Sequence, residues 1–321
     1  MSRLTSLREA TCPDVAVDIG TGRVSAARLE RRGEQKVVVA HAADLLPDGA
    51  LVPSLTAANI HDRPAVTKAL SGVLERVGRP RRIGLVVPDL IAKVSLVKFE
   101  RVPTRTQDLD QLVRWQVRKT APFPIEEAQV SYVPGVRDGD GQEFLVSLAR
   151  REVIAEYEQL CADAGAHAGI VDLATFNVIN AVLGGATTAG GDWLLVHVAP
   201  DYASIAILRG AHAMFFRNRA ADTEGSLADL VHQTAMYYED RLKGGGFTRV
   251  ILAGAATAGI EHAADIEQAR RSLQERLTTP VETVDPRSAA AIGDRIVASA
   301  ALLDTLAPLV GLLLRDKEAA A

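Results

Sequence analysis

The chain has 321 residues, which is enough to bury a large core and to form two domains. Its hydrophobic content of 48% and charged content of 24% are typical of a folded globular protein and exclude a disordered one. The net charge is −4, so the composition gives no indication of nucleic-acid binding. The only two cysteines, Cys12 and Cys161, exclude a disulfide framework and fit a reducing compartment.

Two stretches bear on membrane insertion. Residues 1–11 carry two arginines but no apolar run, so they are not expected to be a secretory signal. Residues 296–314 are almost wholly apolar and nearly long enough to cross a bilayer. However, Asp304 lies at their centre, where a charge costs about 2.5–3.5 kcal/mol on insertion scales. Pro308 and Gly311 also interrupt the run, so we expect a buried helix and turn.

The first part of the chain predicts strands around one long helix. Short apolar runs indicate strands at residues 15–18, 24–29, 36–40 and 83–87. Between the third and fourth, residues 63–78 place their valines and leucines on one helical face. This pattern is typical of an α/β layer with a mixed sheet.

The next part predicts a small α+β subdomain inserted at about 93–150. Its expected elements are a strand at 93–100, an amphipathic helix at 108–119, and a hairpin formed by 129–133 and 143–148. The helix should end at Thr120-Ala121-Pro122-Phe123-Pro124, because two prolines cannot continue it. Phe123 is expected to plug the subdomain. Trp115 lies off the apolar stripe, and we favour packing under the following loop over a place on a partner surface.

The second half repeats the plan of the first. After helices at 151–163 and 173–183 and a glycine-rich hinge at 184–191, strands are expected at 193–198, 202–208, 213–216 and 250–256, with a helix at 227–242. The recurring order of strands and helix indicates duplication of one α/β unit.

The most informative motif is Asp18-Ile19-Gly20-Thr21-Gly22-Arg23, which follows an apolar strand. Its glycines permit the backbone to approach an anion closely, and Asp18 could hold a magnesium-bound water beside that anion. A second strand follows instead of a helix, so the loop is predicted to be a hairpin tip and not a P-loop.

Two halves that each open on such a hairpin resemble the actin/sugar kinase/Hsp70-type ATPases. That resemblance implies a two-lobed, duplicated ribonuclease H-like α/β fold, with lobes at 12–186 and 191–315. Asp18, Gly20, Thr21 and Arg23 match positions of that family's D-x-G-[ST]-x-x motif, which cradles the β- and γ-phosphates. The implied nucleotide site comprises Asp18, Gly20, Thr21, Gly22, Arg23 and Gly254, with ATP and magnesium as its cofactors and Asp18 as the magnesium residue.

The corresponding motif of the second lobe is largely lost. Where the family has an aspartate and a glycine, this chain has His197 and Ala199, and Pro200 occupies the turn. His197 is expected to be a hydrogen-bonded core residue. Gly254 is the single glycine of a turn that is usually a Gly-Gly pair. Because hydrolysis needs donors on both sides of the γ-phosphate, we expect no catalytic residues and no enzyme activity.

The inserted subdomain narrows the resemblance. The sequence Pro122-Phe123-Pro124-Ile125-Glu126-Glu127 and the strand after it resemble the signature of the PilM family of type IV pilus assembly proteins. The resemblance implies a cytoplasmic adaptor at the inner face of the inner membrane. It would bind the N-terminal tail of a PilN-like protein in a groove that we place at Trp115 and Phe123. Other inner-membrane subunits of the machine are implied as partners, with membrane association only through them.

Two other functions stay open at this point. One is an active ATP-dependent enzyme of the same superfamily, such as a kinase or a polymerising ATPase. The other is the cytoplasmic module of a type II secretion or mannose-sensitive pilus system. No zinc-ligand spacing and no G-x-S-x-G elbow occurs in the sequence.

Overall fold

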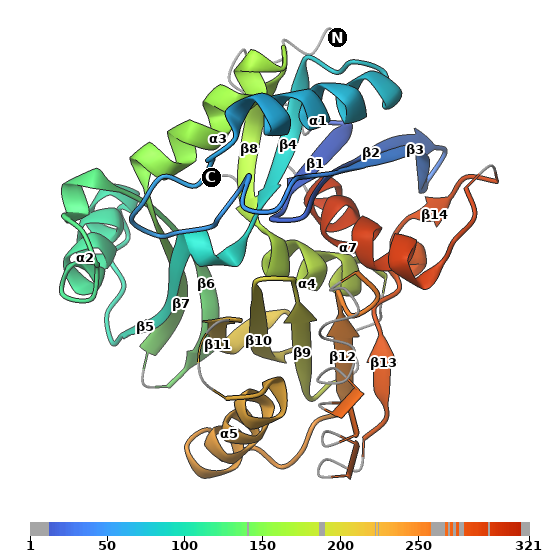
Figure 1. Ribbon diagram of the computed structural model, residues 1–321. Helices are drawn as coiled ribbons and strands as arrows, with labels where there is room; N and C mark the ends of the chain where they lie inside the picture. The colour runs from blue at the N-terminus through green and yellow to red at the C-terminus, as the bar shows by residue number, and fades with distance from the viewer. Residues whose placement is uncertain are drawn as a thin grey trace, which may run out of the picture.

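The computed structural model describes residues 13–139, 141–185, 190–221, 223, 225–257, 267–268, 270–271, 274–275, 279–294 and 296–315. The expectations for residues 1–11, for Cys12 and for residues 186–189 of the hinge at 184–191 lie outside these residues. Figure 1 shows two lobes, each built on its own sheet, and a smaller subdomain at the left.

The first lobe is a six-stranded sheet with helices on both faces. Its strands are β1 (Val15–Ile19), β2 (Arg23–Arg32), β3 (Gln35–Leu45), β4 (Arg82–Val87), β8 (His167–Leu173) and β14 (Ala291–Ile292), in the order β14-β3-β2-β1-β4-β8. The helices α1 (Arg63–Arg76) and α3 (Arg151–Asp163) pack on one face. The side chain of Asp62 caps α1 by accepting from Ala65 N at 3.0 Å, which explains why the helix begins there.

The second lobe has a five-stranded sheet. Its strands are β9 (Asp192–Val198), β10 (Tyr202–Arg209), β11 (His212–Ala220), β12 (Arg249–Ala253) and β13 (Val281–Thr283), in the order β11-β10-β9-β12-β13. The helix α5 (Leu227–Asp240) packs on one face and α4 (Ala174–Gly185) on the other. A capping box between Ser226 and Asp229 begins α5.

The two sheets repeat one topology, as the sequence predicts. The order β3-β2-β1-β4-β8 recurs as β11-β10-β9-β12-β13, and both begin with an antiparallel hairpin. The registers also correspond, because Asp18 lies opposite Ser25 on the first hairpin and His197 lies opposite Ser204 on the second. The duplicated, two-lobed actin-like ATPase fold is confirmed.

The end of the chain crosses back to the first lobe. The short 3₁₀ turn η4 (Pro286–Ser288) leads into β14, and α7 (Ala300–Leu314) covers the open face of the first sheet while also packing against α4. The predicted division placed residues 191–315 in the second lobe. In the structure, β14 is a strand of the first sheet and α7 packs on that sheet. Without α7 that apolar face would meet water. Gly311 permits the close contact, since a Cβ there would lie 1.7 Å from Asn177 O.

The predicted burial of 296–314 holds for the later part of the segment, where α7 is buried from residue 306 to 313 with Pro308 inside the helix, whereas residues 297–301 are exposed. In the part of the chain that the structure describes, no helix is long and apolar enough to cross a membrane.

The inserted subdomain is a three-stranded sheet with one helix. It comprises β5 (Ala92–Phe99), β6 (Ala128–Asp138) and β7 (Gly141–Arg150) in the order β5-β7-β6, and α2 (Thr106–Arg118) covers one face. The 3₁₀ turns η1 (Asp89–Ile91) and η2 (Ile125–Glu127) precede β5 and β6. The chain enters the subdomain from β4 and leaves it into α3, so it is an insertion in the first lobe.

Candidate functional site

The predicted phosphate loop is the tip of the β1–β2 hairpin. Gly20 N donates to Arg23 O at 3.0 Å and so closes a tight turn over Thr21 and Gly22. Asp18 stands just before this turn, half-buried at the end of an otherwise buried strand. The local geometry is therefore the hairpin that the sequence predicts.

The second lobe has an equivalent turn with different residues. Ala199 N donates to Tyr202 O at 2.8 Å, which corresponds to the bond between Gly20 and Arg23 in the first lobe. His197 thus occupies the position of Asp18. The structure thus places His197 and Ala199 at the positions that correspond to Asp18 and Gly20, so the predicted loss of the second aspartate and glycine is confirmed.

A cavity of about 170 Å³ lies between the two hairpin tips. All six residues that the sequence analysis assigned to the nucleotide line it: Asp18, Gly20, Thr21, Gly22, Arg23 and Gly254. The opposite wall comes from the second hairpin, residues 197–202, and from α7 through Asp304 and Pro308. The duplication therefore brings together residues more than 200 positions apart in the chain.

Gly254 shapes one wall of the cavity. Its φ of +79° and a Cβ that would lie 1.9 Å from Val198 O require glycine at this position. Gly254 N and Ala256 N donate to the two carboxylate oxygens of Asp304, at 3.0 and 2.7 Å. The turn that the resemblance assigns to adenosine is thus held by a carboxylate from α7.

The sequence analysis missed Asp89, which ties the lobes together. It is fully buried on η1, where Oδ1 accepts from Thr175 N at 3.1 Å and Oδ2 accepts from the hydroxyls of Thr175 and Ser204. Asn218 Nδ2 donates to its backbone oxygen at 3.2 Å. Thr175 opens α4, and the other two partners belong to the second sheet. The signal in the sequence is a carboxylate at the end of an apolar run, separated from the strand by one residue for Asp89 and within the strand's last two residues for Asp18.

These contacts set the protonation of His197, which is only 8% exposed and is the core histidine that the sequence predicts. The carboxylate of Asp89 can only accept, so it takes the single hydroxyl proton of Thr175. His197 Nδ1, 2.7 Å from that hydroxyl oxygen, must then be the donor. Burial lowers the pKa of His197 and keeps the ring neutral.

The electrostatics of the cavity are dominated by carboxylates. Burial raises the pKa of Asp18 to about 6, an effect that the Arg23 guanidinium opposes and the Asp89 carboxylate reinforces. Burial also raises the pKa of Asp201 and of Asp304, which line the same cavity. The wall of the cavity therefore holds the carboxyl groups of Asp18, Asp201 and Asp304 and a single guanidinium, that of Arg23.

These residues do not fit a magnesium–triphosphate complex. The cavity is smaller than the 300–1,000 Å³ typical of sites for small molecules. Asp201 and Asp304 would repel a polyphosphate, and the amides of Gly254 and Ala256 are already bonded within the protein. Asp18, the predicted magnesium residue, lines the cavity together with Arg23. The first hairpin keeps one half of a phosphate clamp, and the second half is absent.

The two residues predicted for the partner groove differ in burial. Phe123 is half-buried against the core of the subdomain, as expected for a plug. The favoured packing of Trp115 is wrong, because its side chain is 60% exposed on α2. The apolar face of α2 is already filled by Leu109, Leu112, Val113 and Val117, so Trp115 turns to solvent. Neither Trp115 nor Phe123 lines the cavity between the lobes.

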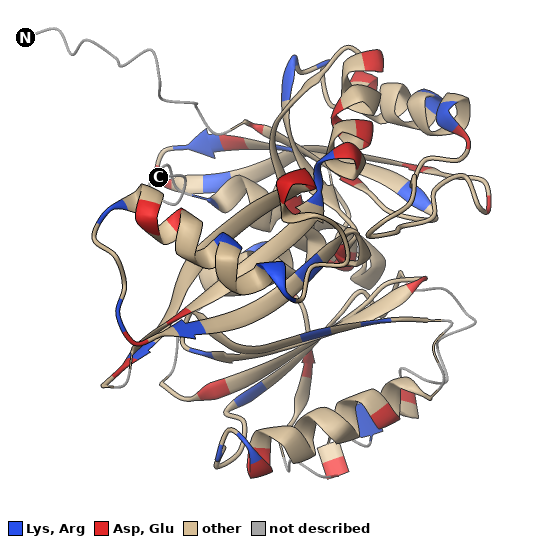
Figure 2. Ribbon diagram, turned by 90° about the vertical axis from the view of Figure 1, so that its left-hand side faces the viewer, with Lys and Arg blue, Asp and Glu red and all other residues tan. Residues whose placement is uncertain are grey.

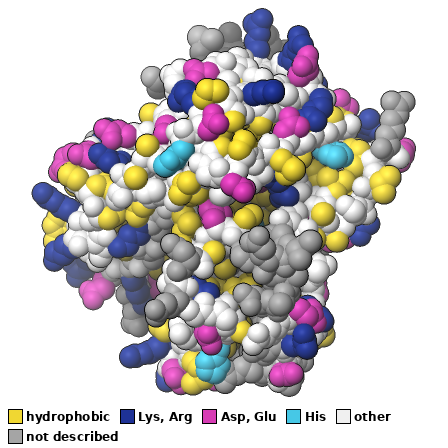
Figure 3. Space-filling model, in the orientation of Figure 1, with side chains coloured by type: hydrophobic (Ala, Val, Ile, Leu, Met, Phe, Trp, Pro, Cys, Tyr) yellow, Lys and Arg dark blue, Asp and Glu magenta, His cyan; other side chains and the backbone are white. Residues whose placement is uncertain are grey.

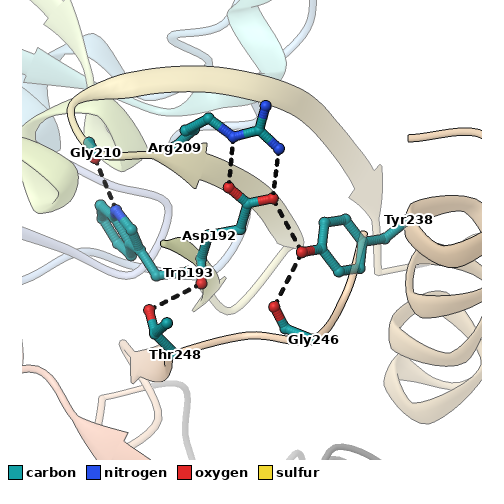
Figure 4. A network of polar contacts seen from close by, with 7 residues as sticks. All are labelled: Asp192, Trp193, Arg209, Gly210, Tyr238, Gly246 and Thr248. Atoms are coloured by element: carbon teal, nitrogen blue, oxygen red, sulfur yellow. Dashed lines mark hydrogen bonds and ion pairs between the residues drawn. The ribbon is translucent and has the colours of Figure 1, made fainter. Parts of the chain in front are cut away.

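A second buried carboxylate lies at the outer end of the second sheet (Figure 4). Asp192 accepts from Arg209 Nε and Nη2 at 2.8 and 2.9 Å, and the Tyr238 hydroxyl lies 2.9 Å from its Oδ2. The Asp192 carbonyl accepts from Thr248. These bonds lower the pKa of Asp192, with the Arg209 bond contributing most. The cluster joins β9, β10 and α5 and is a structural element of the lobe.

Comparison with solved structures supports the fold. The chain is similar to a "PilM-PilN type IV pilus biogenesis complex" chain, with a TM-score of 0.75 and 16% identity, over 95% of this chain and 97% of that one. It is also similar to a Bacteroides thetaiotaomicron protein with an actin-like ATPase fold and unknown function, with a TM-score of 0.50 and 9% identity, over 90% and 94% of the two chains.

The family is shown by a different comparison. The family model described as "Type IV pilus assembly protein PilM" matches residues 16–243. The match includes the first hairpin, the inserted subdomain and the second hairpin, and it covers more than half of the chain. This chain is therefore a member of the PilM family of type IV pilus assembly proteins, built on the actin-like ATPase fold.

Proposed function

We propose that this protein is a cytoplasmic adaptor of a type IV pilus assembly machine. It binds the N-terminal cytoplasmic tail of a PilN-like inner-membrane protein at the inner face of that membrane, and it does not hydrolyse ATP. The observation that carries the adaptor role is the likeness to the PilM–PilN complex chain over almost the whole length of both chains.

The inserted subdomain offers a surface for such a tail. In the order β5-β7-β6, β6 is an edge strand that pairs with β7 in one register over residues 128–134, and among the described residues no other strand is hydrogen-bonded to it, although it also contacts β11 of the second lobe. Val133 on this edge is 45% exposed. An extended peptide can add to an edge strand through main-chain hydrogen bonds, with apolar side chains giving selectivity. We assign the tail to this edge of β6.

Titration of the full chain with N-terminal peptides of PilN-like proteins tests the adaptor role, with scrambled peptides as controls. We expect saturable binding that Val133→Asp weakens at least tenfold and Val52→Asp leaves unchanged. Val52 is a matched control because it is also 45% exposed but lies in the first lobe. If none of the peptides binds at concentrations of tens of micromolar, the adaptor role is refuted. Equal affinities of the two variants would refute the β6 site alone.

The lack of hydrolysis rests on the one-sided phosphate clamp and on the carboxylates of the cavity. A nucleotide present at about 100 times its Kd would raise the free energy of unfolding by about 2.7 kcal/mol. We expect ATP with magnesium to give no such gain and no phosphate release. A rise in Tm that Asp18→Ala abolishes, together with phosphate release, would establish the ATP-dependent enzyme instead. A rise without release would leave nucleotide as a structural ligand.

A further inference from the structure

The outward face of α2 is not used by the core of the protein. Val113 and Val117 are buried against the three-stranded sheet and Leu109 is partly buried there, so this side of the helix belongs to the core of the subdomain. Trp115 lies on the other side and is 60% exposed, and Lys119 Nζ stands 5.6 Å from the centroid of its indole ring. Trp115 is therefore mostly exposed beside a cation and is not a member of the subdomain's buried core.

This face is positive in a protein that is negative overall. Residues 101–119 hold five cations and two carboxylates, a net charge of +3, whereas the whole chain carries −4. Asp110 pairs with Arg114, which removes one carboxylate and one cation. The exposed side chains of Arg101, Arg105, Arg118 and Lys119 have no ion pair among the described residues, and Asp108 is the remaining acid of the segment.

The figures show how these charges are placed. In Figure 2, where α2 faces the viewer, Lys and Arg occur along the loop that enters the helix and again toward its end. In Figure 3, dark-blue side chains gather at the left side, where Figure 1 places α2. The helix protrudes from the molecule, and the cavity between the lobes contains none of its residues.

We propose that the outward face of α2, with Trp115, Arg118 and Lys119 at its C-terminal end and Arg101 and Arg105 in the segment that leads into its N-terminal end, docks on an anionic phospholipid bilayer. Cationic side chains near a membrane are attracted by anionic headgroups, and tryptophan prefers the depth of the headgroups, where its ring is half apolar and half wet. A protruding helix matches a flat bilayer better than it matches a bound peptide. This surface goes beyond the tail-binding role, and it adds a direct contact to the membrane association through partners.

Vesicle flotation with the full chain tests this surface. The vesicles contain either phosphatidylcholine alone or equal parts of phosphatidylcholine and phosphatidylglycerol. We expect binding only to the anionic vesicles, weakened by salt, and a blue shift in the emission of Trp115. Trp193 serves as a constant background because it is 6% exposed. The double variant R118Q/K119Q should bind roughly 25-fold more weakly, about fivefold for each cation.

The matched control is K68Q/R151Q, which makes the same charge change at exposed positions on α1 and α3. It should bind as the unmodified protein does. The proposal is overturned if anionic vesicles do not bind, if R118Q/K119Q binds like the control, or if soluble polyglutamate binds this face and vesicles do not. The tail-peptide titration uses no lipid, so failure of either proposal can be told apart from failure of the other.

Discussion

The outer end of the second sheet and the cleft between the lobes both bury carboxylates, but they treat them in opposite ways. Asp192 accepts two hydrogen bonds from Arg209, and its pKa is lowered. Asp18 accepts no hydrogen bond among the described residues, and burial raises its pKa to about 6. The first arrangement stabilises the fold, and the second destabilises it at neutral pH. Unsatisfied charge is typical of functional sites, so the contrast separates a structural carboxylate from an inherited site residue.

The largest expected effect is on the structural side. Asp192→Ala should lower the free energy of unfolding by about 3 kcal/mol, since it removes a bidentate ion pair with a buried carboxylate. Because the folded pKa is depressed, the contribution of Asp192 is present above the unfolded value and is lost as pH falls through the folded pKa. Urea denaturation at neutral pH measures the loss.

The control for this prediction is Asp285→Ala. Asp285 also forms a bidentate pair, with Arg287, but at the surface, where such pairs contribute at most about 1 kcal/mol. Equal losses of unfolding free energy in the two variants would mean that the burial of Asp192 adds nothing to its ion pair. Asp192 could then no longer be contrasted with Asp18 as a stabilising buried carboxylate.

A gain of stability is expected on the cleft side. The folded state holds the Asp18 proton more tightly than the unfolded state, so stability falls as pH rises from about 3.8 to about 6. Asp18→Asn should therefore raise the free energy of unfolding by about 2 kcal/mol at pH above 7 and leave it unchanged below the unfolded pKa. Paired urea titrations at the two pH values measure this.

Asp48→Asn is the control, since Asp48 is exposed and its side chain has no hydrogen bond or ion pair among the described residues. A loss of stability in Asp18→Asn at neutral pH would show that the carboxylate is satisfied in the folded protein. The cleft would then resemble the Asp192 cluster, and the contrast between the two regions would fail.

The smallest expected effect concerns the junction of the lobes. Asp89→Asn should cost about 1 kcal/mol, because the hydroxyls of Thr175 and Ser204 can rotate to accept from the new amide. Thr175 would then donate to His197 Nδ1 and move the ring proton to Nε2. Nitrogen chemical shifts of His197 report this change directly. An unchanged tautomer would mean that Asp89 does not set the protonation of the cleft.

Most of the fold could be predicted from the sequence, because local patterns decide it. The apolar strand before Asp18, the helical stripe of α1 and the hairpin of β6 and β7 are each encoded within a few neighbouring residues. The repeated order of elements then predicts the duplication. The short strands β13 and β14 were not predicted, since strands of three and two residues are too short to show an alternating apolar pattern.

The candidate site was predicted in part. The residues of the first hairpin and Gly254 do line one cavity. They could be predicted because the family's motifs assign each of them by its position in the sequence. Asp89 was missed because its partners, Thr175 and Ser204, are 86 and 115 residues away. Trp115 was placed wrongly since a helical wheel shows which face is apolar but not whether a loop covers the other face.

The sequence by itself determined the strands, the helices, the tight turn after Asp18 and the loss of its counterpart at His197, since each depends on backbone preferences of adjacent residues. Only the tertiary structure decided that α4 packs on the second sheet, that α7 packs on the first sheet, and that Trp115 is exposed. It also decided the charge balance of the cleft. Burial and electrostatic shifts depend on what surrounds a side chain in space, and distant parts of the chain supply those surroundings.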